Sequence, residues 1–137
     1  MKSGEINSLF KNLSKVIKNP KSDLKYKNKF TLLVSVVLSA QCTDVNVNNV
    51  TENIYPKYNK PEHFVKLGRK KIEKLIKSIG LFRNKSKSVY LLSKQLIEKH
   101  NGKVPKNFDD LYALPGVGRK TASVVLNEGF GLPTIAV

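Results

Sequence analysis

The chain has 137 residues, and its 25 Lys and Arg against 10 Asp and Glu give a formal net charge of +15. This length suits one domain, and the charge favours a polyanionic partner, of which nucleic acid is the commonest. The single cysteine, Cys42, excludes an intrachain disulfide and a four-thiolate metal site within these residues. No signal peptide opens the sequence and the longest apolar run, 30–40, is too short for a bilayer, so we expect no membrane association.

The sequence pattern in the first half of the chain predicts helices. Apolar residues from Ile6 to Ile17 recur at helical spacing and predict an amphipathic helix. The stretch from Phe30 to Cys42 is apolar on nearly all sides; its periodicity fits a buried strand or a buried helix, and its length favours a central helix. Thr43 with Asp44 predicts the cap of a helix that stops near Pro56.

The second half continues the helical pattern. Pro61 predicts the start of a short helix closed by Gly68, and the next helix is expected to end with Gly80 at its C-cap. The longer helix after it is predicted to run from an Asn84 cap to 101–102. Asn107 predicts a further cap, and 119–130 the last helix. The fold class is therefore all-α.

The segment from Leu114 to Ala122 predicts a tight hairpin that opens the last helix. Gly116 and Gly118 lack a Cβ, so the backbone can approach a phosphate there. Lys120 falls in the first helical turn, where the macrodipole disfavours a cation by about 0.3–1 kcal/mol, whereas a phosphate is favoured. These residues suggest an amine nucleophile presented beside a bound phosphate, although a surface lysine that contacts phosphate is the simpler alternative.

This hairpin resembles the helix-hairpin-helix of the endonuclease III family of DNA glycosylases. Three further elements match the family in order: Leu38–Asp44 resembles its LSAQ-x-TD element, Ile79–Lys85 resembles its IGLY-x-x-K loop, and 126–137 continues the likeness. The resemblance implies a six-helix barrel over residues 22–132. It assigns residues 1–21 to the N-terminal helix of an iron–sulfur cluster domain and 133–137 to a link to the rest of that domain.

The same resemblance implies base-excision repair of damaged double-stranded DNA by an enzyme that flips an oxidised pyrimidine out of the duplex. The matching lysine, Lys120, would attack the sugar C1′, displace the base and leave a Schiff base, after which β-elimination cuts the strand. Gln41 would enter the gap and Leu81 would wedge between bases; the structural alternatives are a backbone partner for Gln41 and a cap contact for Leu81. The expected DNA-binding residues are Gln41, Leu81, Lys85, Gly116, Val117, Gly118, Arg119 and Thr121.

One departure from the family is large. The family continues after TIAV with an Asp-Thr-His element, whose aspartate is essential, and ends with four cysteines that bind a 4Fe-4S cluster; the sequence ends at Val137 without them. We therefore expect a fragment or a truncated product with impaired base removal and no metal or cofactor of its own. A monomer in a bacterial cytoplasm, associated with the nucleoid, is the expected state. The alternative function is a catalytically inactive helix-hairpin-helix module that only binds DNA.

Overall fold

Nine of the ten residues of helix α3 are buried, and the other helices are arranged around it. The computed structural model describes residues 23–132, and every regular element within that range is helical, as the sequence predicts. The predicted helix from Ile6 to Ile17 lies outside the described residues. The elements in chain order are α3 (Lys29–Leu38), α4 (Asp44–Thr51), α5 (Pro61–Leu67), α6 (Arg69–Leu75), α7 (Phe82–His100), α8 (Phe108–Tyr112), α9 (Arg119–Val124) and the π-helical turn η1 (Val125–Gly129).

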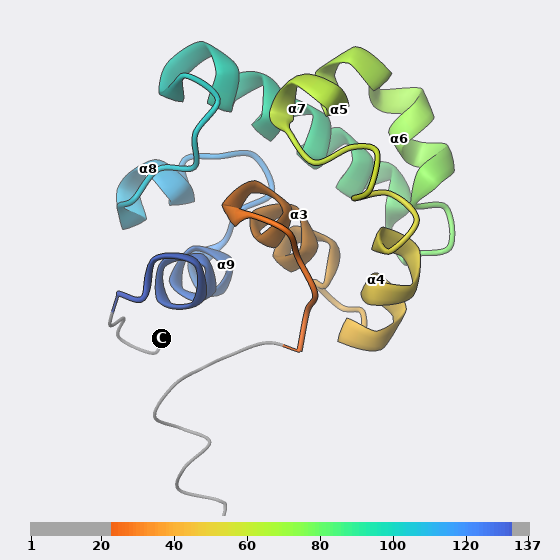
Figure 1. Cartoon of the computed structure of the whole chain (residues 1–137), viewed down its shortest axis with the longest axis horizontal. Coiled ribbons are helices and arrows are strands. Elements are labelled where there is room, and N and C mark those ends of the chain that lie inside the picture. The colour runs from red at the N-terminus through yellow and green to blue at the C-terminus, as the bar shows by residue number, and fades with distance from the viewer. Residues whose placement is uncertain (1–22, 133–137) are drawn as a thin grey trace, which may run out of the picture.

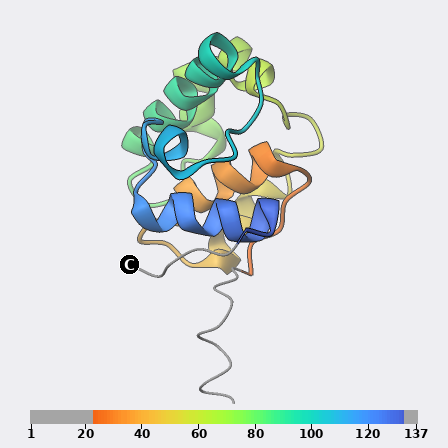
Figure 2. The ribbon, with the colours of Figure 1, turned by 90° about the vertical axis from the view of Figure 1, so that its left-hand side faces the viewer.

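Helix α3 lies in the middle of the molecule, with α9 beside it and α4 next to its C-terminal end (Figure 1). Helices α5, α6 and α7 pack against one another on the other side (Figure 1). Figure 2 shows α9 running alongside α3, and η1 continues α9 without a break. The predicted helix 119–130 is therefore confirmed, with its last turn widened to π geometry.

Thr31 and Ser35 are the buried polar residues of α3, and the buried Tyr55 hydrogen-bonds to both. The Tyr55 hydroxyl donates to the Thr31 carbonyl at 3.0 Å and also pairs with the Ser35 hydroxyl. Burial is the main reason that the pKa of Tyr55 is raised above its ordinary value, so this network stays uncharged. At the start of α3, the Asn28 side chain accepts from the Thr31 N–H at 2.8 Å while the Thr31 hydroxyl accepts from the Asn28 N–H, which completes a capping box.

Several predicted helix boundaries are confirmed. Thr43 caps α4 by accepting from the Asn46 N–H, Pro61 is the first residue of α5, and Asn107 caps α8 by accepting from the Asp110 N–H. Asp44 follows the Thr43 cap, and its carboxylate accepts the Asp23 N–H at 2.8 Å, which ties the chain ahead of α3 to α4. Asp44 is thus a structural anchor.

Three predicted boundaries are wrong. The central helix ends at Leu38, not at Cys42, and α6 ends at Leu75, well before Gly80. After α6 the chain leaves the helical path at Ile76, in a turn that buries both Ile76 and Ile79. Helix α7 begins at Phe82 rather than after Asn84.

The sequence missed the start of α7 because its N-cap is Leu81, a residue without a capping side chain. Leu81 takes the left-handed conformation, with φ 60° and ψ 32°, and its carbonyl accepts the Lys85 N–H at 3.0 Å. Among residues 23–132, none of the helices is both long and apolar enough to span a membrane.

Candidate nucleic-acid interface

Buried apolar side chains hold the hairpin between α8 and α9 against the core. Leu114 and Val117 are buried in the core, and the Val117 N–H donates to the Leu114 carbonyl at 3.1 Å. Between them Gly116 takes a positive φ of 78°, the region that favours glycine. Gly116 and Gly118 are exposed, so the hairpin presents bare backbone to solvent while its apolar residues hold it in place.

The first turn of α9 is open to an external acceptor. Gly118 is the N-cap and has no side chain that could cap the helix, and the first intrahelical bond runs from the Ala122 N–H to the Gly118 carbonyl at 3.0 Å. The N–H groups of residues 119–121 therefore lack intrahelical acceptors. Lys120 and Arg119 are exposed in this turn, Thr121 is half-buried, and no acidic residue accompanies them. An anion is the complementary ligand.

Gly116 also packs closely against α7. A Cβ on Gly116 would lie 2.6 Å from Ser88 Cβ and 3.6 Å from Val37 Cγ1. Nothing lies within 4 Å of the corresponding position on Gly118. The two glycines thus have different structural roles: Gly116 allows the hairpin to touch α7, whereas Gly118 leaves the space in front of α9 clear. Sequence reasoning missed Ser88, because no pattern links it to a glycine 28 positions later.

Three exposed non-glycine residues within 23–132 have left-handed backbone: Gln41, Leu81 and Asn101. Asn101 follows the end of α7, where asparagine commonly takes this conformation, so the other two need a different explanation. Gln41 has φ 58° in the turn after α3, and Leu81, 55% exposed, has φ 60° before α7. A non-glycine residue in this region costs of order 1–3 kcal/mol and persists only when its surroundings hold it there. Such strain is concentrated at functional sites, and the two residues are the ones predicted to insert into DNA.

Lys85, one of the expected DNA-binding residues, is buried, whereas a lysine that contacts DNA would be exposed. Lys85 is 6% exposed, and its Nζ donates to the Leu38 carbonyl at 2.8 Å and to the Ala40 carbonyl at 2.6 Å. Burial lowers the pKa of Lys85 below its ordinary value, and the nearby Cys42 opposes that shift. Every other lysine in the described part of the chain is exposed. The structure therefore places the Lys85 ammonium on the protein's own backbone.

These contacts bring three distant segments together. Lys85 joins α7 to the end of α3, and Gly116 lies close to Ser88 of α7, on the side where an added Cβ would also meet Val37 of α3. In Figure 2 the blue hairpin before α9, the orange loop after α3 and the green turn before α7 all lie on the left-hand side of the molecule. The segments that carry Gln41, Leu81 and Lys120 are thus grouped on one side of the fold.

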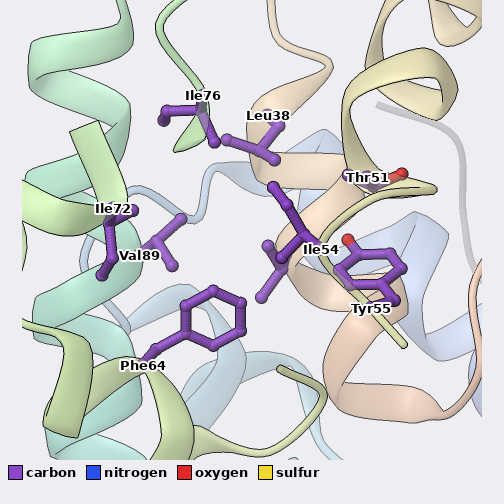
Figure 3. A pocket seen from close by; sticks show the side chains of 9 residues that line it. Leu38, Thr51, Ile54, Tyr55, Phe64, Ile72, Ile76 and Val89 are labelled. Atoms are coloured by element: carbon purple, nitrogen blue, oxygen red, sulfur yellow. The ribbon is translucent and has the colours of Figure 1, made fainter. Parts of the chain in front are cut away.

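One cavity in the interior is too small to hold a substrate. That cavity has a volume of about 10 Å³, which is the size of one water at most, and its lining is almost entirely apolar (Figure 3). Two open hollows of about 320 and 340 Å³ lie on the surface, and neither is lined by Gln41, Leu81 or Lys120. The candidate interface is therefore an exposed surface on the isolated chain.

The residues of this chain do not fit the 4Fe-4S cluster that the family resemblance implies. Four thiolates bind such a cluster, and the 137 residues contain one cysteine. Within residues 23–132, no group of three or more His, Cys, Asp or Glu is arranged to hold a metal ion. Cys42 is instead half-buried, and its sulfur accepts a hydrogen bond from the Asn46 side chain at 3.2 Å.

Comparison with protein families decides the classification. Residues 34–136 match the model of the HhH-GPD superfamily base excision DNA repair protein. The chain belongs to this family. It is 50% identical over 137 residues to Endonuclease III of Rickettsia conorii, covering 100% of the chain and 65% of that relative. With Endonuclease III of Escherichia coli K12 it shares 48% identity over 119 residues, 87% of the chain and 56% of the relative. The chain thus spans less than two thirds of these HhH-GPD relatives.

Solved structures of this family agree with the fold. The chain superimposes with a TM-score of 0.85 and 43% identity on a trapped Endonuclease III–DNA covalent intermediate, an estranged-adenine complex, over 100% of the chain and 64% of that structure. A non-covalent Endonuclease III–DNA complex gives the same values. A thermostable thymine-DNA glycosylase matches with a TM-score of 0.76 at 24% identity, which supports the fold alone. The predicted helix-hairpin-helix glycosylase fold is therefore confirmed.

Proposed function

We propose that the chain is the barrel part of a DNA repair glycosylase and abasic-site lyase, in which Lys120 is the catalytic amine. The observation that carries the proposal is the open first turn of α9: Lys120 is exposed there, directly after the two-glycine hairpin and among N–H groups that no side chain caps. Membership of the base excision repair family and the likeness to Endonuclease III–DNA complexes support the same function.

The hairpin is proposed to bind a phosphate of the damaged strand. The acceptors it lacks within the protein are supplied by phosphate oxygens, which meet the N–H groups of residues 119–121. Gly116 and Gly118 allow the close approach, the buried Val117 keeps the hairpin in position, and Arg119 adds positive charge. With a net charge of +15, binding is expected to fall steeply with salt, with a slope near −0.9 per neutralised phosphate in log K against log salt concentration.

Cleavage at a pre-formed abasic site requires a nucleophilic amine next to the sugar, whereas base removal is expected to be impaired without the family's aspartate, which these 137 residues do not contain. On an oxidised pyrimidine nucleotide, the Lys120 amine forms a bond to C1′ while the bond from C1′ to the base breaks, and the product rearranges to an imine. Loss of a proton from C2′ then breaks the bond from C3′ to the phosphate oxygen and cuts the strand. At a pre-formed abasic site the ring-opened aldehyde condenses with the same amine and releases water.

Gln41 and Leu81 are proposed to act on the opposite side of the lesion. Both are exposed on left-handed backbone. Gln41 lies in the turn after the buried helix α3, and Leu81 is the N-cap of α7, so each side chain projects from the end of a helix. The amide of Gln41 can hydrogen-bond to the base left unpaired, and the apolar Leu81 can part neighbouring bases. The resulting assembly uses one copy of the chain, and we propose that it works as a monomer on nucleoid DNA in a bacterial cytoplasm.

Borohydride trapping on a duplex with a single abasic site tests the proposal. The imine is reduced to a stable covalent adduct, which appears on a denaturing gel as protein joined to DNA. Lys120→Ala is expected to abolish the adduct, while Lys99→Ala, which removes an exposed lysine of α7, is expected to leave it intact. An equal adduct from Lys120→Ala would mean that the basic surface reacts nonspecifically. DNA binding without any adduct from the wild-type chain would identify an inactive binding module.

A further inference from the structure

We propose that Lys85 is a positioning residue, which holds the Ala40 carbonyl and thereby keeps Gln41 in its left-handed conformation. The proposal concerns the turn that follows α3, where Gln41 is exposed and Lys85 lies beneath it. It rests on the proposed function for one point only, that Gln41 meets DNA. The conformation of the turn itself follows from contacts within the chain.

The turn belongs to a class that Gln41 does not favour by itself. The Cys42 N–H donates to the Ser39 carbonyl at 3.0 Å, so residues 39–42 form a β-turn with Gln41 in its third position. Gln41 has a positive φ and Ala40 does not, which identifies a type II turn. Glycine or asparagine normally occupies this third position. A glutamine there needs an external contact to keep the turn from adopting type I.

The contact that Lys85 makes is the one that distinguishes the two turn types. Types I and II differ by a flip of the central peptide, whose carbonyl belongs here to Ala40. The Lys85 ammonium holds this oxygen at 2.6 Å, and the flip would withdraw the oxygen from it. A cation away from water that loses an acceptor is strongly disfavoured, so the bond selects the type II form.

Lys85 can act in this way because it is itself anchored at two further points. Its Nζ also donates to the Leu38 carbonyl at 2.8 Å. This is one of the last carbonyls of α3, to which no N–H group of the same helix donates. No basic residue of α3 lies in its last turn, so Lys85 supplies from α7 the charge that a helix C-terminus favours. Its backbone N–H donates to the Leu81 carbonyl at 3.0 Å. One residue thus contacts the backbone on both sides of the proposed insertion site.

NMR on the 137-residue chain tests the contact directly. In the wild-type chain, the Lys85 ammonium is expected to exchange slowly with water and to show couplings through the hydrogen bonds to the Leu38 and Ala40 carbonyl carbons. In Lys85→Met, the backbone chemical shifts of Gln41 are expected to lose their left-handed signature. Lys87→Met is the matched control, because it removes an exposed lysine from the same helix, and Gln41 is expected to keep its signature there.

Two results would overturn the inference. One is rapid exchange of the wild-type Lys85 ammonium with no coupling to Ala40, which needs no variant and holds even if Lys85→Met fails to fold. The other is a folded Lys85→Met chain in which Gln41 stays left-handed.

A binding measurement separates this inference from the proposed function. Lys85→Met and Gln41→Ala are both expected to lose the preference for a duplex with an abasic site over an intact duplex, whereas Lys87→Met is expected to retain it. If the turn flips in Lys85→Met but the preference persists, the insertion role of Gln41 is wrong and the positioning contact stands.

Discussion

Gly116 of the hairpin lies directly against Ser88 of α7, so closely that a Cβ on residue 116 would be 2.6 Å from Ser88 Cβ and 2.8 Å from Ser88 Oγ. This contact fixes the hairpin relative to the helix that carries Lys85. It also means that Gly116 serves the fold, whatever it contributes to phosphate binding.

Gly116→Ala is therefore expected to destabilise the chain. The clash with Ser88 and the positive φ of 78° each add strain, and together they lower the free energy of unfolding by about 1–3 kcal/mol. Urea denaturation measures the loss. Combining Gly116→Ala with Ser88→Gly is expected to restore part of it in a double-mutant cycle, since that change removes the clash and leaves the backbone strain. Additive effects of the two changes would show that residues 88 and 116 do not interact.

Gly118→Ser separates folding from DNA binding. The backbone there is extended, with φ −97° and ψ −175°, and nothing lies within 4 Å of a new Cβ, so serine fits and can cap α9. The free energy of unfolding is expected to stay level or rise by up to about 1 kcal/mol. Affinity for duplex DNA, measured by fluorescence anisotropy, is expected to fall because the side chain occupies the place of the phosphate. Unchanged affinity would mean that the phosphate binds elsewhere.

Gln41→Gly and Leu81→Gly are expected to make the protein more stable and less selective. Glycine relieves a left-handed strain of about 1–2 kcal/mol and costs about 0.5–1 kcal/mol in unfolded-state entropy, so each change raises the free energy of unfolding by up to about 1.5 kcal/mol. The preference for a duplex with an abasic site over an intact duplex is expected to disappear in the double variant. Equal affinity losses on both duplexes would show that the side chains are ordinary surface contacts.

The buried Lys85 gives a pH dependence of known sign. Its pKa is lowered in the folded state, mainly by burial, so between that value and its ordinary 10.5 the unfolded chain binds more protons than the folded chain. The contribution of Lys85 to the free energy of unfolding therefore increases as the pH rises through this window. Urea denaturation of the wild type and of Lys85→Met at matched pH values isolates the effect, since the other titrating groups cancel. A difference that stays constant or shrinks with pH would contradict it.

Sequence patterns predicted the helices whose ends depend on local side chains. Thr43 and Asn107 each cap a helix with their own oxygen, and Pro61 opens α5 with a fixed φ, so the signal and the structure involve the same few residues. The end of α7 at Asn101 is equally local, because the left-handed residue follows the helix directly. The family motifs located the hairpin for a similar reason, since its turn residues are contiguous.

The features that escaped prediction depend on contacts between distant residues. Asn84 has the chemistry of a cap, yet α7 begins at Phe82 because Leu81 is held left-handed in the turn that follows the buried Ile79. Gly80 is a plausible C-cap, but burial of Ile76 ends α6 earlier. Lys85 is one of many lysines in the sequence, and only the folded backbone of α3 reveals that its partners are carbonyls 45 and 47 residues away.

The isolation of Lys85 from water makes it a built-in reporter. A reagent that acylates amines reaches the other described lysines of the folded chain, because all of them are exposed, while Lys85 is protected by the end of α3. Within residues 23–132, peptide mapping after brief labelling would therefore show one unmodified lysine among many modified ones. The rate at which Lys85 is finally acylated measures how often α3 and α7 separate. Bound DNA that stabilises the loops between these helices would slow this rate without contacting the Lys85 amine.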